Sequence, residues 1–118
     1  MYSSQLLDHF EHPRNSGELG DADAHVRIEN PACGDILELA IRMDDGRIAD
    51  VRFRAKGCVA AVACASAMTE LAKGKPANDA LSISREEIVA AVGGVPPASR
   101  HAAQLAIDAL RAALAKLG

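Results

Sequence analysis

Residues 35–53, DILELAIRMDDGRIADVRF, decide the fold because they have the pattern of two strands joined by a tight turn. Apolar and polar side chains alternate on both sides of DDGR, which is the period-2 pattern of a half-buried strand. The pair Asp45-Gly46 between two such runs is a strong hairpin signal. The stretch therefore predicts an antiparallel hairpin with strands at 35–43 and 48–53.

The segments before the hairpin extend this prediction. Residues 25–30 (HVRIEN) alternate in the same way and predict a further strand, which makes a three-stranded antiparallel meander. Residues 3–11 (SSQLLDHFE) begin with Ser, carry apolar side chains and stop before Pro13, so they predict a short helix. The Gly, Asn and Asp residues of 15–24 predict a loop.

The segments after the hairpin are mostly helical. An alanine-rich run at 59–74 has almost no polar face and predicts a helix buried against the sheet. KPANDA (75–80) is predicted as loop, and Ser84 with Glu87 predicts a capping box that starts a short helix ended by Gly93-Gly94. Apolar residues at helical spacing in 99–118 predict a terminal helix, and these are Ile107, Leu110, Leu114 and Leu117.

The fold class is therefore α+β. We expect a small three-stranded antiparallel sheet with helices packed on one face, a short N-terminal helix and a long C-terminal helix. The 118 residues fit one domain, 1–118, and the composition of 49% apolar but only 3% aromatic residues predicts a core of Ala, Val, Leu and Ile.

Composition also excludes several partners. The formal charge is −3 and the 13 basic residues are spread along the chain, so we expect no nucleic-acid partner. No stretch approaches the roughly 20 apolar residues that span a bilayer, and the start carries acids where a signal peptide is positive, so we expect a cytoplasmic protein without membrane contact. Three cysteines, an odd number, favour thiols used as ligands or nucleophiles over disulfides.

Four side chains at the junctions between predicted elements could bind a metal: Cys33, Asp35, Cys58 and His101. Strand alternation puts 33 and 35 on the same side if the chain is extended there. Cys58 lies where a strand changes to a helix, and the free amides of a first helical turn favour a thiolate. Two thiolates, a carboxylate and an imidazole suit zinc or iron-sulfur ligation, although spacings of about 25 and 43 residues are far less specific than a CxxC pair.

Other interpretations of these residues stay open at this point. Asp35 could cap a turn, and His101 could be a solvated residue of a first helical turn. Cys64 is interpreted as a small core residue. His9, His12 and His25 are most simply surface residues. The sequence has no nucleophile with a base and an orienting group, and no phosphate-binding glycine loop, so we do not expect an enzyme.

Several motifs in order resemble the U-type iron-sulfur cluster assembly scaffolds, the family of IscU, SufU and the N-terminal domain of NifU. LLDHFEHPRNSGEL (6–19) resembles the opening helix and the DHYENPRN signature of the family. NPACGD (30–35) resembles the first cysteine motif, and RFRAKGCVAAVACASAMTELAKGK (52–75) resembles the second with the helix that follows. The resemblance runs from end to end of the chain.

The resemblance implies that Cys33 and Cys58 are cluster or zinc ligands, that Asp35 tunes cluster lability and that His101 is the histidine of a His-Cys pair. The chain departs from the family at Ala102, where these scaffolds carry their third cysteine, since a methyl group cannot bind iron or accept sulfur. Cys64 is a poor substitute because it lies about 600° around the helix from Cys58. VPPASRH (95–101) keeps only the proline pair of the Leu-Pro-Pro-Val-Lys segment that a dedicated Hsp70 chaperone binds.

The resemblance leads to two hypotheses. The first is a scaffold that assembles a transient [2Fe-2S] cluster with sulfur from a cysteine desulfurase and passes it to apo iron-sulfur proteins, with zinc able to occupy the same site. An Hsp70-type chaperone pair is a further candidate partner, and we expect a monomer or weak dimer. The second, motivated by Ala102, is a zinc-binding sulfur carrier or desulfurase regulator that builds no cluster.

Overall fold

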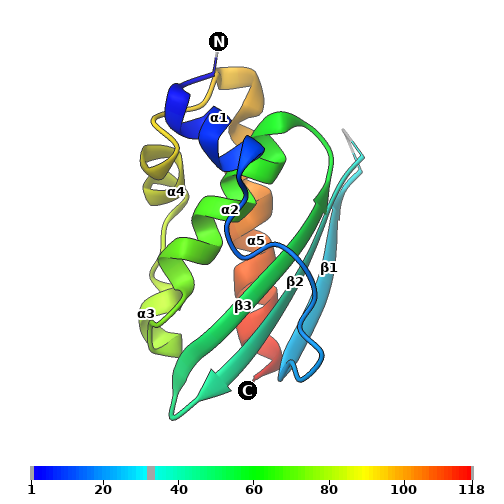
Figure 1. The fold of residues 1–118 in the computed structure, drawn as a ribbon, viewed down its shortest axis with the longest axis vertical. Coiled ribbons are helices and arrows are strands. Elements are labelled where there is room, and N and C mark those ends of the chain that lie inside the picture. The colour runs from blue at the N-terminus through cyan, green and yellow to red at the C-terminus, as the bar shows by residue number, and fades with distance from the viewer. Residues whose placement is uncertain (1, 32–33, 118) are drawn as a thin grey trace.

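A computed structural model describes residues 2–31 and 34–117 of the chain. Helices and strands follow one another in the order that the sequence predicts, with two additional short helices at 77–81 and 97–99 (Figure 1). The elements are α1 (Ser4–Glu11), β1 (Ala24–Asn30), β2 (Asp35–Asp44), β3 (Arg47–Lys56), α2 (Val59–Ala72), α3 (Ala77–Leu81), α4 (Arg85–Ala91), the 3₁₀-helix Pro97–Ser99 and α5 (Arg100–Lys116).

The three strands form an antiparallel sheet in the order β1-β2-β3, which confirms the predicted meander. Asp45 and Gly46 form the two-residue turn between β2 and β3 and have φ angles of +53° and +76°. Positive φ at both central residues gives the backbone twist that a tight hairpin requires. The outer edge of β3 is also occupied, because Phe53 donates its N–H to Asn15 and accepts an N–H from Gly17, both at 2.9 Å.

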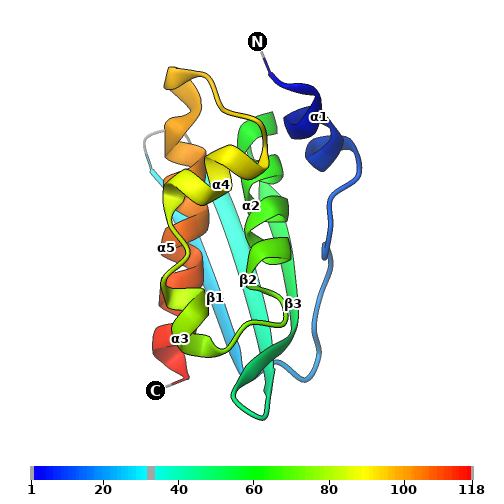
Figure 2. The same ribbon diagram turned by 90° about the vertical axis from the view of Figure 1, so that its left-hand side faces the viewer.

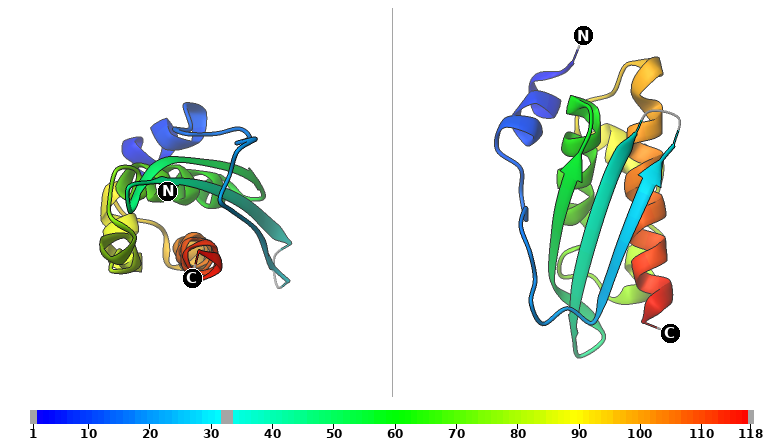
Figure 3. Two further views of the ribbon diagram at one scale, coloured as in Figure 1. Left: turned by 90° about the horizontal axis from the view of Figure 1, so that it is seen from below. Right: turned by 90° about the vertical axis from the view of Figure 1, so that its right-hand side faces the viewer.

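Helices α2 and α5 pack against the same face of the sheet (Figure 2). The residues of β2 that point to them, among them Leu37, Leu39 and Ile41, are buried, whereas Glu38 lies on the opposite face beside Arg27 and Arg54. Viewed from the other side, the sheet stands in front of these two helices (Figure 3). The predicted α+β arrangement, with its short first helix and long last helix, is confirmed.

Helix α2 is surrounded by other elements, which explains why its sequence has almost no polar face. It contacts α1, α4, α5 and β3, and ten of its residues are buried. Most of these are alanines, whose small side chains let neighbouring elements approach closely. The capping box that starts α4 is also as predicted, with the Ser84 side chain accepting from the Glu87 N–H and the Glu87 side chain accepting from the Ser84 N–H.

Two predictions are wrong. Residues 75–80 were predicted as loop, but α3 begins at Ala77 after Pro76, a residue whose fixed φ suits the start of a helix. His9 was interpreted as a surface residue, but it is buried between α1 and α2. Its Nδ1 lies 2.8 Å from the Ser66 hydroxyl and its Nε2 lies 3.5 Å from a Glu70 carboxylate oxygen, so α2 supplies the polar partners that make burial tolerable.

Among the described residues, no helix is long and apolar enough to cross a membrane.

Candidate metal centre

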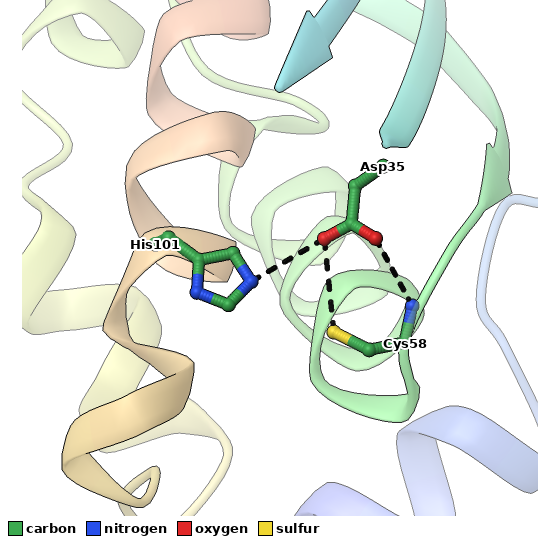
Figure 4. Close-up of side chains that lie close together, drawn as sticks. All are labelled: Asp35, Cys58 and His101. Atoms are coloured by element: carbon green, nitrogen blue, oxygen red, sulfur yellow. Dashed lines mark hydrogen bonds and ion pairs between the residues drawn. The ribbon is translucent and has the colours of Figure 1, made fainter. Parts of the chain in front are cut away.

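Three of the four predicted ligands lie close together, and their side chains point toward one another (Figure 4). Asp35 is the first residue of β2, and its place in the strand turns its side chain to the face that the helices cover. Cys58 is the N-cap of α2, directly after the turn from β3. His101 lies in the first turn of α5. The ligand atoms of these three side chains all lie within 4.8 Å of one another.

Asp35 is at the centre of this group. Its Oδ1 accepts the backbone N–H of Cys58 at 3.2 Å, and its Oδ2 lies 3.7 Å from Cys58 Sγ and 3.4 Å from His101 Nε2. The side chain is 4% exposed, so the carboxylate is almost removed from water. A buried carboxylate is costly unless hydrogen bonds or a positive charge compensate it. One oxygen has a backbone donor, and the other faces a thiol and an imidazole.

The environment of His101 Nε2 is evidence that a cation can bind between Asp35, Cys58 and His101. This nitrogen is buried, although 35% of the side chain is exposed, and within residues 2–31 and 34–117 it has no hydrogen-bond partner. Its 3.4 Å contact with Asp35 is an ion pair only if the ring is protonated. A carboxylate, a sulfur and an imidazole nitrogen directed at one point are a donor set that zinc or iron can satisfy. The donor chemistry and the unsatisfied nitrogen therefore fit a metal ion.

The two described cysteines have different environments. Cys58 is half-buried and its Sγ accepts the N–H of Ala61 at 3.4 Å, as expected of a thiol at a helix start. Cys64 is completely buried within α2, and burial, with a smaller contribution from Cys58, raises the pKa of its thiol to about 12. The interpretation of Cys64 as a core residue is confirmed, because its side chain is fully buried and belongs to the hydrophobic core.

Two other positions that the sequence analysis discussed, Cys33 and Ala102, do not add a described ligand to the site. Cys33 lies outside the described residues. Ala102, next to His101, is 1% exposed and belongs to the hydrophobic core. Sequence reasoning also missed Gly57, whose lack of a side chain leaves room for the Asp35 carboxylate. The signal was a glycine directly before a cysteine at a strand-to-helix junction.

Comparison with known proteins gives consistent matches. The chain is 46% identical over 114 residues to the iron-sulfur cluster assembly scaffold protein IscU 1 of Archaeoglobus fulgidus. This alignment covers 97% of the present chain and 74% of the relative. The chain is 40% identical over 118 residues to the scaffold protein IscU of Escherichia coli K12, covering 97% and 91%. Both relatives are named as scaffold proteins rather than enzymes, in agreement with the prediction that this chain is not an enzyme.

The fold is also shared with solved structures. A candidate scaffold protein for the SUF system of Fervidobacterium islandicum superposes with a TM-score of 0.81 at 23% identity, covering 96% of each chain. At this identity the likeness shows the fold alone. The model of the NifU-like N terminal domain matches residues 1–117. With this match and the IscU relatives, the chain belongs to the NifU-like N terminal domain family, the U-type scaffolds.

Proposed function

We propose that the chain is a scaffold for the assembly and transfer of an iron-sulfur cluster of the [2Fe-2S] type. The observation that carries this proposal is the convergence of Asp35, Cys58 and His101 on one point in a chain of the U-type scaffold family. The names of its IscU relatives support the same role. In this proposal the cluster is cargo, held by these three residues together with Cys33, and zinc can occupy the same site.

The donor set suits a cargo that must leave. Four thiolates are the usual ligands of a stable cluster, whereas this site replaces two of them with a carboxylate and an imidazole. The hard carboxylate oxygen of Asp35 matches soft iron-sulfur chemistry less well than a thiolate does. His101 and Cys58 are both partly exposed, so an acceptor protein can approach the site from solvent. A weakly held and accessible cluster is the expected property of a transfer protein.

The partners follow from this role. A cysteine desulfurase supplies sulfur to a site thiol, and apo iron-sulfur proteins accept the cluster. Pro96-Pro97 begins the 3₁₀-helix that precedes α5, and this segment is the proposed contact for an Hsp70-type chaperone pair. We further propose that residues 1–118 act as one domain, as a monomer or weak dimer, in the cytoplasm.

The test is anaerobic reconstitution with ferrous iron, a desulfurase, cysteine and an excess of a thiol reductant that reduces the delivered sulfur to sulfide, followed by absorption and Mössbauer spectra. We expect a [2Fe-2S] signature in the native protein and its loss in Cys58→Ser. The matched control is Cys64→Ala, which removes a thiol that is buried in α2 and should leave the spectra unchanged. Absence of any cluster in the native protein, with the fold intact, would contradict the proposal.

A second candidate is a zinc-binding sulfur carrier or desulfurase regulator. The observation that favours it is Ala102, whose buried methyl group offers no ligand atom beside His101. In the same experiment, one tightly bound zinc per chain with no cluster signal would favour this second function. A change in desulfurase turnover on addition of the zinc-loaded protein would then identify it as a regulator.

A further inference from the structure

Gly57 lies between the end of β3 and the N-cap of α2, directly against Asp35. A Cβ atom at this position would meet Asp35 Oδ1 and would lie 2.7 Å from Cγ and 3.1 Å from Cβ of the same residue. Cβ atoms in proteins essentially never approach other heavy atoms closer than 3.0 Å, so something would have to shift. The carboxylate occupies the space that any larger residue would need.

Most of the other described glycines have open space around the same position. Apart from the adjacent residues in the chain, no described residue has a heavy atom within 4 Å of a Cβ built at Gly17, Gly20, Gly34, Gly46, Gly74 or Gly94. At Gly93 the Cβ would meet the flexible end of Gln5 and the Ser3 hydroxyl, and neither residue is a candidate ligand. Only Gly57, among the glycines in the described part of the chain, makes room for a candidate ligand.

We propose that Gly57 is a positioning residue that seats the Asp35 carboxylate in the metal centre and thereby selects which of its oxygens faces the ion. The lack of a side chain lets the carboxylate lie against the backbone, where Oδ1 accepts the N–H of Cys58 at 3.2 Å. This leaves Oδ2 directed at Cys58 Sγ and His101 Nε2. The contact between Gly57 and Asp35 does not depend on the proposed function. Only its consequence, that Asp35 binds the ion through one oxygen, rests on the proposed metal-binding function.

The physical reason is that hydrogen bonds to the second oxygen of a ligating carboxylate orient it and tune its affinity. Here the donor is the backbone of another ligand, Cys58, so the two ligands are fixed relative to each other before any ion arrives. A methyl group at position 57 would push the carboxylate away from this amide. Both the hydrogen bond and the direction of Oδ2 would then be lost together.

The first experiment needs no metal. Urea unfolding midpoints are measured for the metal-free native protein, Gly57→Ala, Asp35→Ala and the double variant. We expect Gly57→Ala to lower the midpoint clearly in the native background and much less in the Asp35→Ala background, because the carboxylate atoms of the two closest contacts are then gone. Backbone strain at position 57 would cost the same in both backgrounds, so equal losses would overturn the proposal.

The cycle also covers a variant that fails to fold. If Gly57→Ala is unfolded but the double variant is folded, the clash with Asp35 is the cause and the proposal is supported. If both are unfolded while Asp35→Ala alone is folded, position 57 matters for another reason and the proposal is wrong. The amide proton of Cys58 gives a second reading, since its exchange with solvent should speed up in Gly57→Ala as it does in Asp35→Ala.

The second experiment measures zinc affinity by competition with a chromophoric chelator. We expect Gly57→Ala to bind zinc about 10-fold to 100-fold more weakly, the usual cost of losing a partner that orients a ligand. The control is Gly20→Ala, in a loop with open space around the added methyl group, which should bind as the native protein does. Native zinc affinity in a folded Gly57→Ala would overturn the proposal. A native protein that binds no zinc would count against the proposed zinc site, while the unfolding cycle would still decide the role of Gly57.

Discussion

Replacement of His101 by alanine should separate the stability of the fold from the stability that zinc adds. In the metal-free protein the ring is partly exposed and its buried nitrogen has no hydrogen bond to any residue that the structure describes, so the substitution should change the unfolding free energy by no more than about 0.5 kcal/mol. The same nitrogen is one of the three described donors at the metal centre. Its loss should therefore be visible mainly when zinc is present.

The magnitude follows from binding to the folded state. At a free zinc concentration about 100 times Kd, the native protein gains about 2.7 kcal/mol. Loss of a direct ligand should raise Kd by at least about 100-fold, since even an outer partner costs about 10-fold to 100-fold. At the same zinc concentration the variant then gains only about 0.4 kcal/mol. An unfolding entropy of about 2.1 cal/mol/K per residue, for 118 residues, converts these gains to Tm shifts of about 11 °C and about 2 °C.

The assay is thermal unfolding followed by circular dichroism, with a chelator and with buffered zinc. The matched control is His25→Ala, which removes an exposed imidazole from β1 on the face of the sheet opposite the helices and should keep the full zinc shift. If His101→Ala keeps the same zinc shift as the control, His101 does not bind the ion and the reasoning from convergent side chains fails.

Three further predictions concern other parts of the chain. Burial lowers the pKa of His9 below its usual 6.5. The neutral ring therefore contributes fully to the free energy of unfolding above that pH, and this contribution is lost as the pH falls below it. His9→Gln should flatten the decrease in unfolding free energy between about pH 7 and about pH 5. Because burial raises the pKa of Cys64 to about 12, iodoacetamide at about pH 8 should leave Cys64 unmodified in the folded protein while it alkylates Cys58, and peptide mass spectrometry would show labelling of both if this is wrong. Ser84→Ala removes the capping box of α4 and should cost about 1 kcal/mol in urea unfolding, whereas an unchanged midpoint would mean that the box adds nothing.

The strands and long helices could be predicted because local chemistry and tertiary structure agree there. The Asp45-Gly46 turn supplies the positive φ angles of a tight hairpin, and the apolar positions of α5 face the sheet as their spacing indicates. Helix α3 was missed because its five residues, with Asn and Asp among them, have weak helical propensity. Contacts with α5, which is distant in the sequence, stabilise this short helix.

Helix α1 shows the limit of pattern reasoning. Its apolar residues do not share one buried side, because Leu7 and Phe10 are exposed whereas Leu6 and the polar His9 are buried. The Ser66 hydroxyl of α2 gives the buried His9 ring a hydrogen-bond partner. The sequence near His9 does not indicate this partner, because Ser66 is 57 residues away. For the same reason, the spacing of Asp35, Cys58 and His101 in the sequence could suggest but not establish that their side chains come together. Their meeting depends on how β2, α2 and α5 come together.

The placement of the donors on three separate elements also affects how an ion would be released. Asp35 and Cys58 are 23 residues apart and Cys58 and His101 are 43 apart, so a bound ion would close two long loops of chain, as a crosslink does. Under the proposed function, a partner that draws the start of α5 outward would remove the imidazole while Asp35 and Cys58 keep their mutual hydrogen bond. Unloading could then proceed donor by donor, by local opening of one helix end, without unfolding the sheet.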